Sequence, residues 1–165
     1  MYGVSWSPSG LHVALCTVDK AVHVWKAKKP EEVFQTFKNM PKVCYVTAFS
    51  DDGKWFGCGG GGGDGGYVHI YAAKQGWEEA KASEADKYHF AATIRLKLKS
   101  FVYAFAFIPD CDTHRKFVHG GGDCAVTVRD LDSGSVLQKF KSDYKVFSQP
   151  IFHICYAISI RFPFH

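Results

Sequence analysis

The glycines at residues 59–63 are the first feature of the chain that could do chemistry, because glycine-rich loops can hold phosphate groups. A P-loop needs a lysine and a serine or threonine after its last glycine and opens a helix, and a dinucleotide-binding loop also leads into a helix. Here Asp64 and a strand-like segment follow instead. An acidic residue at that point would repel phosphate, so the glycines predict a strand end and a widened hairpin rather than a nucleotide site.

The chain contains eight histidines, a number that raises the question of a metal site. His23 and His69 occupy equivalent positions in an internal repeat, which places them on neighbouring repeat units with the same orientation. Repeat geometry therefore explains them better than metal coordination does. The histidines that fall within expected strands are His12, His23, His69 and His119.

The cysteines include no Cys-x-x-Cys pair, so their spacing does not indicate a zinc site. Most of them lie in apolar runs, where we expect buried free thiols in a reducing compartment. A nucleophilic Cys16 or Ser50 would need an oriented histidine and a third group, and no local signature supplies them. The sequence therefore predicts a protein that is not an enzyme, with no catalytic, cofactor-binding or metal-ligating residue and no cofactor. The cysteines are Cys16, Cys44, Cys58, Cys111, Cys124 and Cys155.

The elements that position these residues come from a repeat in three copies, at residues 4–27, 46–73 and 103–131. Each copy has an alternating apolar segment, a turn, a second apolar segment, an Asp-centred turn and a third alternating segment. Alternation with a period of two, interrupted by turn residues, is typical of strands joined by hairpins. A fourth strand-like segment follows each copy, so the sequence predicts four short strands three times over. These fourth segments are residues 32–37, 93–98 and 136–140.

The Asp-centred turns set the period of the repeat. Asp19, Asp64 and Asp123 are separated by 45 and 59 residues, and the first interval matches a repeat of about 40–45 residues. The second interval contains an insertion at residues 74–91, which is rich in the helix formers Glu, Ala and Lys. We expect a short exposed helix or a solvated loop there.

In these repeated residues the chain resembles the WD40-repeat β-propeller family, over residues 3–141. The resemblance implies an all-β fold, a partial β-propeller of four-stranded antiparallel blades at residues 3–42, 43–98 and 101–141. Residues 151–165 contain neither Gly nor Asp, so the segment 142–165 is expected to be a divergent C-terminal segment or the start of a fourth blade. The motifs that carry the resemblance are residues 6–10 with 22–26, residues 49–54 with 61–71, and residues 126–130.

The chain departs from the family pattern at two places. Family repeats often have a Gly-His pair before the innermost strand, and no such pair precedes a strand here. The position of the family's Trp-Asp pair reads Trp-Lys, Tyr-Ala and Arg-Asp in the three copies. In the family the turn aspartate bonds to that histidine, so Asp19, Asp64 and Asp123 match only the aspartate half of the network. We expect these three residues to keep a structural role in their turns, because Asp bonds to the backbone that follows it.

Composition agrees with an all-β protein, because 16 glycines and an aromatic fraction of 16% favour turns and sheet faces. Lys and Arg number 20 against 16 Asp and Glu, and they are spread along the chain. That distribution favours an ordinary solvated surface and makes nucleic acid an unlikely partner. The first residues do not resemble a signal peptide, and the apolar run at 151–160 is too short to span a bilayer. We therefore expect a cytoplasmic or nuclear protein without a membrane span.

The resemblance implies a scaffold that mediates protein–protein interactions in a larger complex, because propeller blades present loops around a rigid platform. The sequence does not identify the partner proteins. An open arc of three blades also leaves sheet faces uncovered, so we expect self-association or a longer parent chain. The candidate partner contacts, chosen by loop position, are Lys20, Asn39, Met40, Lys42, Lys99, Phe101 and Tyr144.

The alternative function, from a different class, is binding of nucleic acid or anionic lipid through residues 95–103. Arg95, Lys97 and Lys99 alternate along this segment, and Phe101 and Tyr103 follow them. Strong dependence on salt concentration would mark such binding.

Overall fold

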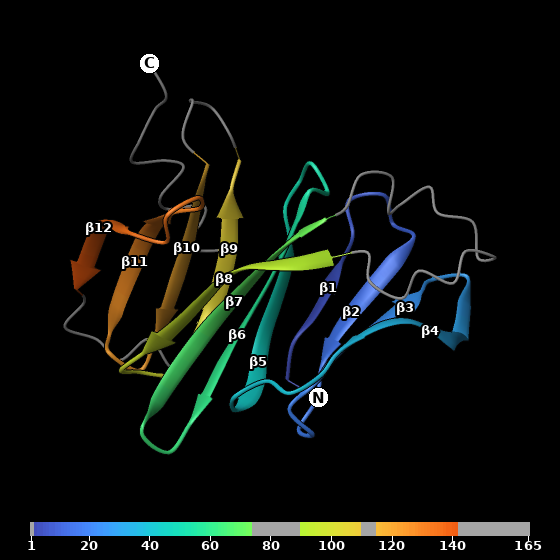
Figure 1. Cartoon of the computed structure of the whole chain (residues 1–165), viewed down its shortest axis with the longest axis horizontal. Helices are drawn as coiled ribbons and strands as arrows, with labels where there is room; N and C mark the ends of the chain where they lie inside the picture. The colour runs from blue at the N-terminus through green and yellow to red at the C-terminus, as the bar shows by residue number, and fades with distance from the viewer. Residues whose placement is uncertain (1, 74–89, 110–114, 142–165) are drawn as a thin grey trace.

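The computed structural model in Figure 1 describes residues 2–73, 90–109 and 115–141. Within those ranges the secondary structure consists of strands, without a helix. The strands are β1 (Val4–Trp6), β2 (His12–Cys16), β3 (Val22–Lys26), β4 (Lys29–Phe37), β5 (Val43–Phe49), β6 (Trp55–Gly62), β7 (Gly65–Ala73), β8 (Phe90–Leu98), β9 (Val102–Ile108), β10 (Lys116–Gly121), β11 (Ala125–Asp130) and β12 (Val136–Lys141).

The strands form three four-stranded sheets, in which each strand pairs antiparallel with its neighbour along the chain. We call the sheets blade 1 (β1–β4), blade 2 (β5–β8) and blade 3 (β9–β12). They stand side by side in chain order in Figure 1, and the first strands β1, β5 and β9 contact one another in turn. This arrangement confirms the prediction of an all-β fold with four-stranded antiparallel blades.

Two strands are longer than the alternation predicts. Strand β4 includes Pro30, which lacks an N–H but lies on the outermost strand of blade 1, where one side of the ladder needs no donor. Strand β8 begins at Phe90, so the end of the expected insertion at 74–91 is part of a strand. The rest of that insertion, residues 110–114 and the segment 142–165 lie outside the described residues.

The turns between the first and second strands of blades 1 and 2 are built alike. Gly10 and Gly53 have φ values of 71° and 68°, a region in which glycine has no steric penalty. The Ser7 hydroxyl accepts the His12 N–H at 3.1 Å, and the Ser50 hydroxyl accepts the N–H of the equivalent residue in blade 2 at 2.9 Å. Ser7 and Ser50 are therefore equivalent positions, which fixes how residues of one blade correspond to those of the next.

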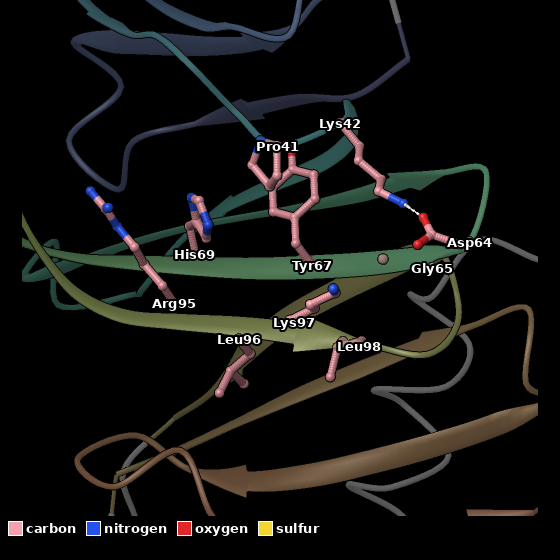
Figure 2. Close-up of a pocket in the computed structure, with 11 residues that line it drawn as sticks. Pro41, Lys42, Asp64, Gly65, Tyr67, His69, Arg95, Leu96, Lys97 and Leu98 are labelled. Atoms are coloured by element: carbon pink, nitrogen blue, oxygen red, sulfur yellow. Dashed lines mark hydrogen bonds and ion pairs between the residues drawn. The ribbon is translucent and has the colours of Figure 1, made fainter.

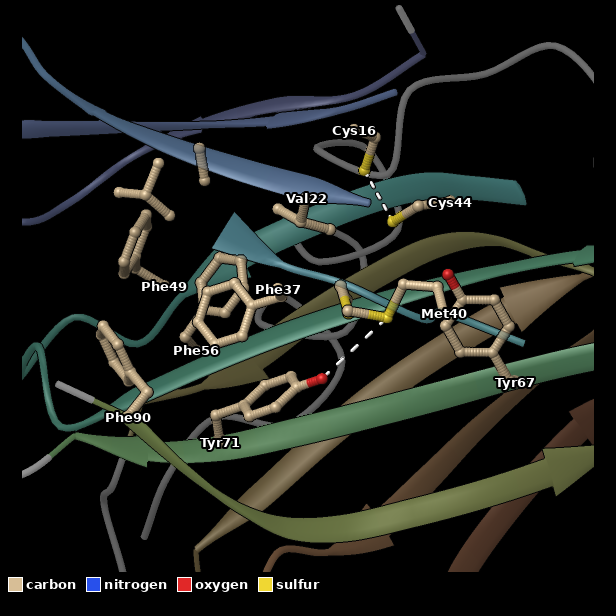
Figure 3. Close-up of a cluster of buried hydrophobic side chains, with 13 residues drawn as sticks. Cys16, Val22, Phe37, Met40, Cys44, Phe49, Phe56, Tyr67, Tyr71 and Phe90 are labelled. Atoms are coloured by element: carbon tan, nitrogen blue, oxygen red, sulfur yellow. Dashed lines mark hydrogen bonds between the residues drawn. The ribbon is translucent and has the colours of Figure 1, made fainter. Parts of the chain in front are cut away.

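Blades 1 and 2 share a core of aromatic rings and sulfur atoms (Figure 3). Phe56 is fully buried in it, with ring centroids 5.1 Å from Phe37 and 4.8 Å from Phe49. Burial of such rings provides a large share of the hydrophobic stabilisation of a small domain. The other buried members of this core are Ala14, Cys16, Val22, Val24, Met40, Cys44, Cys58, Tyr67, Tyr71 and Phe90.

Blades 2 and 3 share a second core, in which Phe105 and Phe117 of blade 3 pack against Val68 and Ile70 of blade 2. Alternate residues of blade 2 thus face blade 1 and blade 3, as the period of two in a strand requires. The blade is covered on both sides.

The glycine run at residues 59–63 forms the second half of strand β6 and enters the hairpin turn to β7, which confirms the prediction of a strand end and a hairpin. The glycines of β6 are needed because strand β5 and an aromatic ring of blade 3 approach them closely. A Cβ atom on Gly57 would lie 2.3 Å from the Phe105 ring, and one on Gly60 would lie 1.9 Å from the Val43 carbonyl oxygen. The missing side chains leave room for the aromatic core of blade 3 and for strand β5.

Candidate functional site: the hairpin end of the arc

One end of the arc carries the β2–β3, β6–β7 and β10–β11 turns and the two connectors that join the blades; we call it the hairpin end. The first connector, residues 38–42, reaches the turn of blade 1, where the Met40 N–H donates to the Lys20 carbonyl at 3.1 Å. The second connector, residues 99–101, reaches the turn of blade 3, where the Gly122 N–H donates to the Phe101 carbonyl at 3.1 Å. Backbone hydrogen bonds thus hold loops from different blades together as one surface.

Asp19, in the turn of blade 1, contacts a histidine from its own blade. Its carboxylate lies 3.3 Å from His23 Nε2 and also accepts the Thr17 hydroxyl. His23 Nδ1 lies 3.1 Å from the Thr36 hydroxyl oxygen. The hydrogen bond from Thr17, followed by that from His23, lowers the pKa of Asp19. The carboxylate is therefore anchored within its own blade.

The other two turn aspartates contact lysines. Asp64 forms an ion pair with Lys42 of the first connector, and this hydrogen bond lowers the pKa of Asp64. Asp123 pairs with Lys139 of strand β12 at 2.9 Å. All three turn aspartates therefore have a partner at the hairpin end, two of them a lysine.

A first hollow, of about 350 Å³, lies between the first connector and strands β7 and β8 (Figure 2). Arg95 and Lys97 line it from β8, where they pair across the strands with His69 and Tyr67 of β7. Lys42, which forms the ion pair with Asp64, lines the side of the hollow that the first connector forms. The rest of the lining is largely apolar or glycine and consists of Pro41, Asp64, Gly65, Gly66, Leu96 and Leu98.

A second hollow, of about 280 Å³, lies one blade further along, between the second connector and blade 3. It is arranged like the first hollow. Lys139 pairs across the strands with Thr127 in blade 3, at the position where Arg95 pairs with His69 in blade 2. Lys97 lines both hollows. The two hollows are therefore repeats of one site. The remaining residues of the second hollow are Leu98, Lys99, Ser100, Phe101, Val102, His119, Gly121, Asp123, Arg129 and Val136.

The fold gathers at the hairpin end cations that are spread along the sequence. The only acids of the described residues at this end are the three turn aspartates, each already partnered. Arg95, Lys97 and Lys99 are exposed, and none of them forms an ion pair with another described residue. The surface is therefore electropositive. Its cations are Lys20, Lys38, Lys42, Arg95, Lys97, Lys99, Lys139 and Lys141.

The opposite end of the arc differs in charge. There the ion pairs join residues of opposite sign within one blade, with N–O distances of 2.7–3.5 Å. The pairs are Lys26–Glu32, Lys54–Asp52 and Arg115–Asp132. Because these charges largely cancel, an anionic partner is attracted to the hairpin end rather than to this one.

His69 and His119 border the hollows as neutral side chains. Burial, followed by the charge of Arg95, lowers the pKa of His69 from 6.5 to about 4. Burial, followed by the charge of Arg129, lowers that of His119 from 6.5 to about 4 as well. The Arg129 Nε–H donates to His119 Nε2 at 3.0 Å, which also requires an unprotonated acceptor. At neutral pH the positive charge of the surface therefore comes from lysine and arginine.

These histidines make stability depend on pH. Between pH 6.5 and about 4 the unfolded chain binds protons at both histidines that the folded chain does not bind. We expect the free energy of unfolding to fall as the pH drops through this window. The fall should be smaller in the His119→Gln variant, because glutamine keeps a hydrogen-bond acceptor for Arg129 but does not titrate. Urea denaturation at several pH values measures the difference. An equal loss in the variant and the wild type would contradict this origin.

The residues predicted to contact a partner lie in different parts of the protein. Lys20 and Asn39 are exposed, with φ values of 61° and 60°. Lys42, Lys99 and Phe101 line the hollows. Tyr144 lies outside the described residues.

Met40 requires a correction. It lies in the connector, as predicted, but its side chain is only 3% exposed and belongs to the core of blades 1 and 2. Its sulfur lies 3.9 Å from the Tyr71 hydroxyl oxygen (Figure 3). An apolar side chain in a loop next to a core is drawn into it, so Met40 presents no surface to a partner.

Lys97 was identified from the sequence, but Lys38, Lys139 and Lys141 of the basic surface were not. Lys38, Lys97 and Lys141 occupy the same position in the three blades. Each lies on or just after the fourth strand, two residues after the residue that pairs with His23, His69 or Thr127 of the third strand. Aligning the fourth strands as closely as the first three would have revealed this repeated lysine.

The structure shows where the residues considered for metal binding and catalysis lie. Within the described ranges no group of three or more His, Cys, Asp or Glu side chains is placed to hold a metal ion. Cys16 and Cys44 are buried with their sulfur atoms 2.8 Å apart, and the hydrogen bond to Cys44 together with burial raises the pKa of Cys16. The Ser50 hydroxyl donates to Asp52 at 2.6 Å within its turn.

Comparison with known proteins agrees with the geometry. No family model matches the chain, and no curated protein matches its sequence. Among the described residues no helix is long and apolar enough to cross a membrane. Among solved structures the chain is similar to U3-55K, a WD40 β-propeller protein, with a TM-score of 0.65 and 11% sequence identity. The match covers 87% of this chain and 39% of the U3-55K chain, so this chain has the fold of part of a β-propeller.

Proposed function

We propose that the protein is a WD40-type scaffold that binds an acidic segment of a partner protein at its hairpin end. The observation that carries this proposal is the row of exposed cations Arg95, Lys97 and Lys99, which have no acidic partner among the described residues and lie along two hollows. Cations held on a rigid sheet can bind carboxylates without first breaking ion pairs of their own.

The hollows favour a peptide over a purely electrostatic partner. Pro41, Tyr67, Leu96 and Leu98 give the first hollow an apolar lining beside its cations. A hollow of about 350 Å³ is large enough for side chains of a peptide, and binding sites generally combine apolar walls with a few placed polar groups. Apolar residues of the partner would enter the hollows while its carboxylates meet the lysines.

The second candidate function is binding of nucleic acid or anionic lipid through residues 95–103. The same three cations favour it. Single-stranded nucleic acid also needs free aromatic faces for stacking. Here Phe101 packs against the position of Gly61, and the Tyr103 ring lies 5.3 Å from Tyr45 and 6.0 Å from Phe101. Phe101 is half-buried, and the Tyr103 ring, although 37% exposed, already contacts two other rings. The protein partner is therefore favoured.

The experiment is a titration of the full chain into a fluorescent Asp/Glu-rich peptide that carries Leu and Phe residues, followed by anisotropy. We expect Arg95→Glu/Lys97→Glu/Lys99→Glu to weaken binding roughly ten-fold or more, since each lost surface ion pair is worth about 0.2–1 kcal/mol. The matched control is Lys28→Glu/Lys29→Glu/Lys54→Glu, which makes the same charge change with exposed residues at the opposite end.

Equal weakening in the two triple variants would show that net charge, and not this site, attracts the peptide. Single-stranded RNA and anionic vesicles are titrated in parallel. Tighter binding of either one than of the peptide, again lost in the first variant alone, would assign the surface to that partner instead.

A further inference from the structure

Blade 1 has one covered face and one open face. Cys16, Val22 and Val24 point toward blade 2 and are buried in the shared core. The residues between them point the other way, and Val4 and Trp6 on β1 are 54% and 61% exposed. In the cross-strand register these belong to two apolar rows, Val4–Leu15–His23 and Trp6–Val13–Trp25–Val33.

The open face uses the same positions as the faces that blades 2 and 3 pack against their neighbours. With Ser7 and Ser50 aligned, Trp6 corresponds to Phe49, Val13 to Phe56 and Trp25 to Tyr71. Those three residues of blade 2 are buried against blade 1. The corresponding ring of blade 3, Phe117, is buried against blade 2. By continuity with two established interfaces, the open face of blade 1 is therefore a surface for packing against another sheet.

The apolar surface includes one polar residue, His23. Its ring nitrogens lie 3.3 Å from Asp19 and 3.1 Å from Thr36. Because its ring nitrogens already have partners, the histidine can be covered without leaving an unsatisfied polar atom. Val33, which is 47% exposed, extends the surface to the outermost strand. Monomeric proteins rarely expose a continuous apolar patch of this kind.

We propose that this face binds the same face of a second copy of the chain, around a two-fold axis. The other end of the arc is different, because Ala104, Val118 and Val128, which point away from blade 2 in blade 3, are only 3–8% exposed. Among the residues that the structure describes there is thus one open face rather than two complementary ones. This favours a closed dimer in which equal surfaces meet over an open chain of copies. Two such sheets pack face to face in the manner of a β-sandwich. The proposal is independent of the acidic partner, because the face includes none of the cations Arg95, Lys97 and Lys99, which lie on β8 and the second connector.

The test is size-exclusion chromatography with light scattering on the full chain over a range of concentrations. We expect a mass of twice 18.4 kDa for the wild type at high concentration. Trp6→Lys should raise the dissociation constant of the dimer at least about 30-fold, as expected for an interface tryptophan. Trp6 is 61% exposed, so its replacement leaves the interior intact, and Val4→Asp provides a second variant of the same face. Far-UV circular dichroism checks that both variants fold.

The control is Leu137→Lys, which places the same charge on a 51% exposed residue of blade 3. It should leave the dimer unchanged. A wild type that stays at 18.4 kDa at all concentrations would overturn the proposal, and so would a dimer that survives both variants of the face. Masses that grow beyond the dimer, or equal disruption by Leu137→Lys, would also overturn it by showing contacts elsewhere on the arc.

Discussion

Replacing Phe56 with alanine should lower the free energy of unfolding by about 3–5 kcal/mol, the usual cost of removing a buried phenylalanine. Phe56 is fully buried, and its ring lies within 5.9 Å of the Phe37, Phe49 and Phe90 ring centroids. These rings come from both blades, so the cavity would weaken the contact between blades 1 and 2 as well as the strand itself. Urea denaturation followed by circular dichroism measures the change.

The matched control for this cavity is Leu137→Ala, because Leu137 is also a large apolar strand residue but is 51% exposed. Its loss should cost less than about 1 kcal/mol. If the two substitutions had similar effects, the ring cluster would not be the core that joins the blades.

Gly60→Ala should destabilise the protein by about 3 kcal/mol, toward the upper end of the cost of overpacking. The added methyl would lie 1.9 Å from the Val43 carbonyl oxygen and 2.9 Å from the Cys44 Cα. Both atoms belong to the backbone of strand β5, which cannot move aside as a flexible side chain can. Relief would require β5 to separate from β6, which would disturb the inner strands of the arc.

The control for this clash is Gly62→Ala, two residues further along the same strand. A methyl there would meet only the side chain of Lys42, at 3.8 Å, which is ordinary van der Waals contact. We expect its free energy of unfolding to stay within about 0.5 kcal/mol of the wild type, as for most surface substitutions. Equal destabilisation by both substitutions would show that the strand requires glycine for a reason other than the approach of β5.

The blades were predictable because their signals are local. Alternation of apolar residues specifies a strand, and the turns at Gly10, Gly53 and Asp64 mark where strands end. The residues that follow the glycine run were enough to predict that it is part of a strand. The reason why glycine is required could not be predicted, because the Phe105 ring that lies against Gly57 is 48 residues away in sequence.

The candidate site was predictable only in part, because it consists of segments that meet through tertiary structure. Arg95, Lys97 and Lys99 stood out as a local alternation. The pairing of Lys42 with Asp64 depends on a connector folding over a hairpin 22 residues away. Met40 was misplaced for the same reason, since a loop position alone does not show whether an apolar side chain turns toward the core.

Binding of acidic protein segments at the hairpin end can be tested by mapping the bound peptide on the full chain by NMR. An Asp/Glu-rich peptide is titrated into the isotope-labelled protein, and backbone amide shifts are followed. We expect the largest changes at Lys42, His69 and residues 95–99, around the two hollows. Largest changes around Lys28 and Lys54 at the opposite end, or no change at saturating peptide, would contradict it.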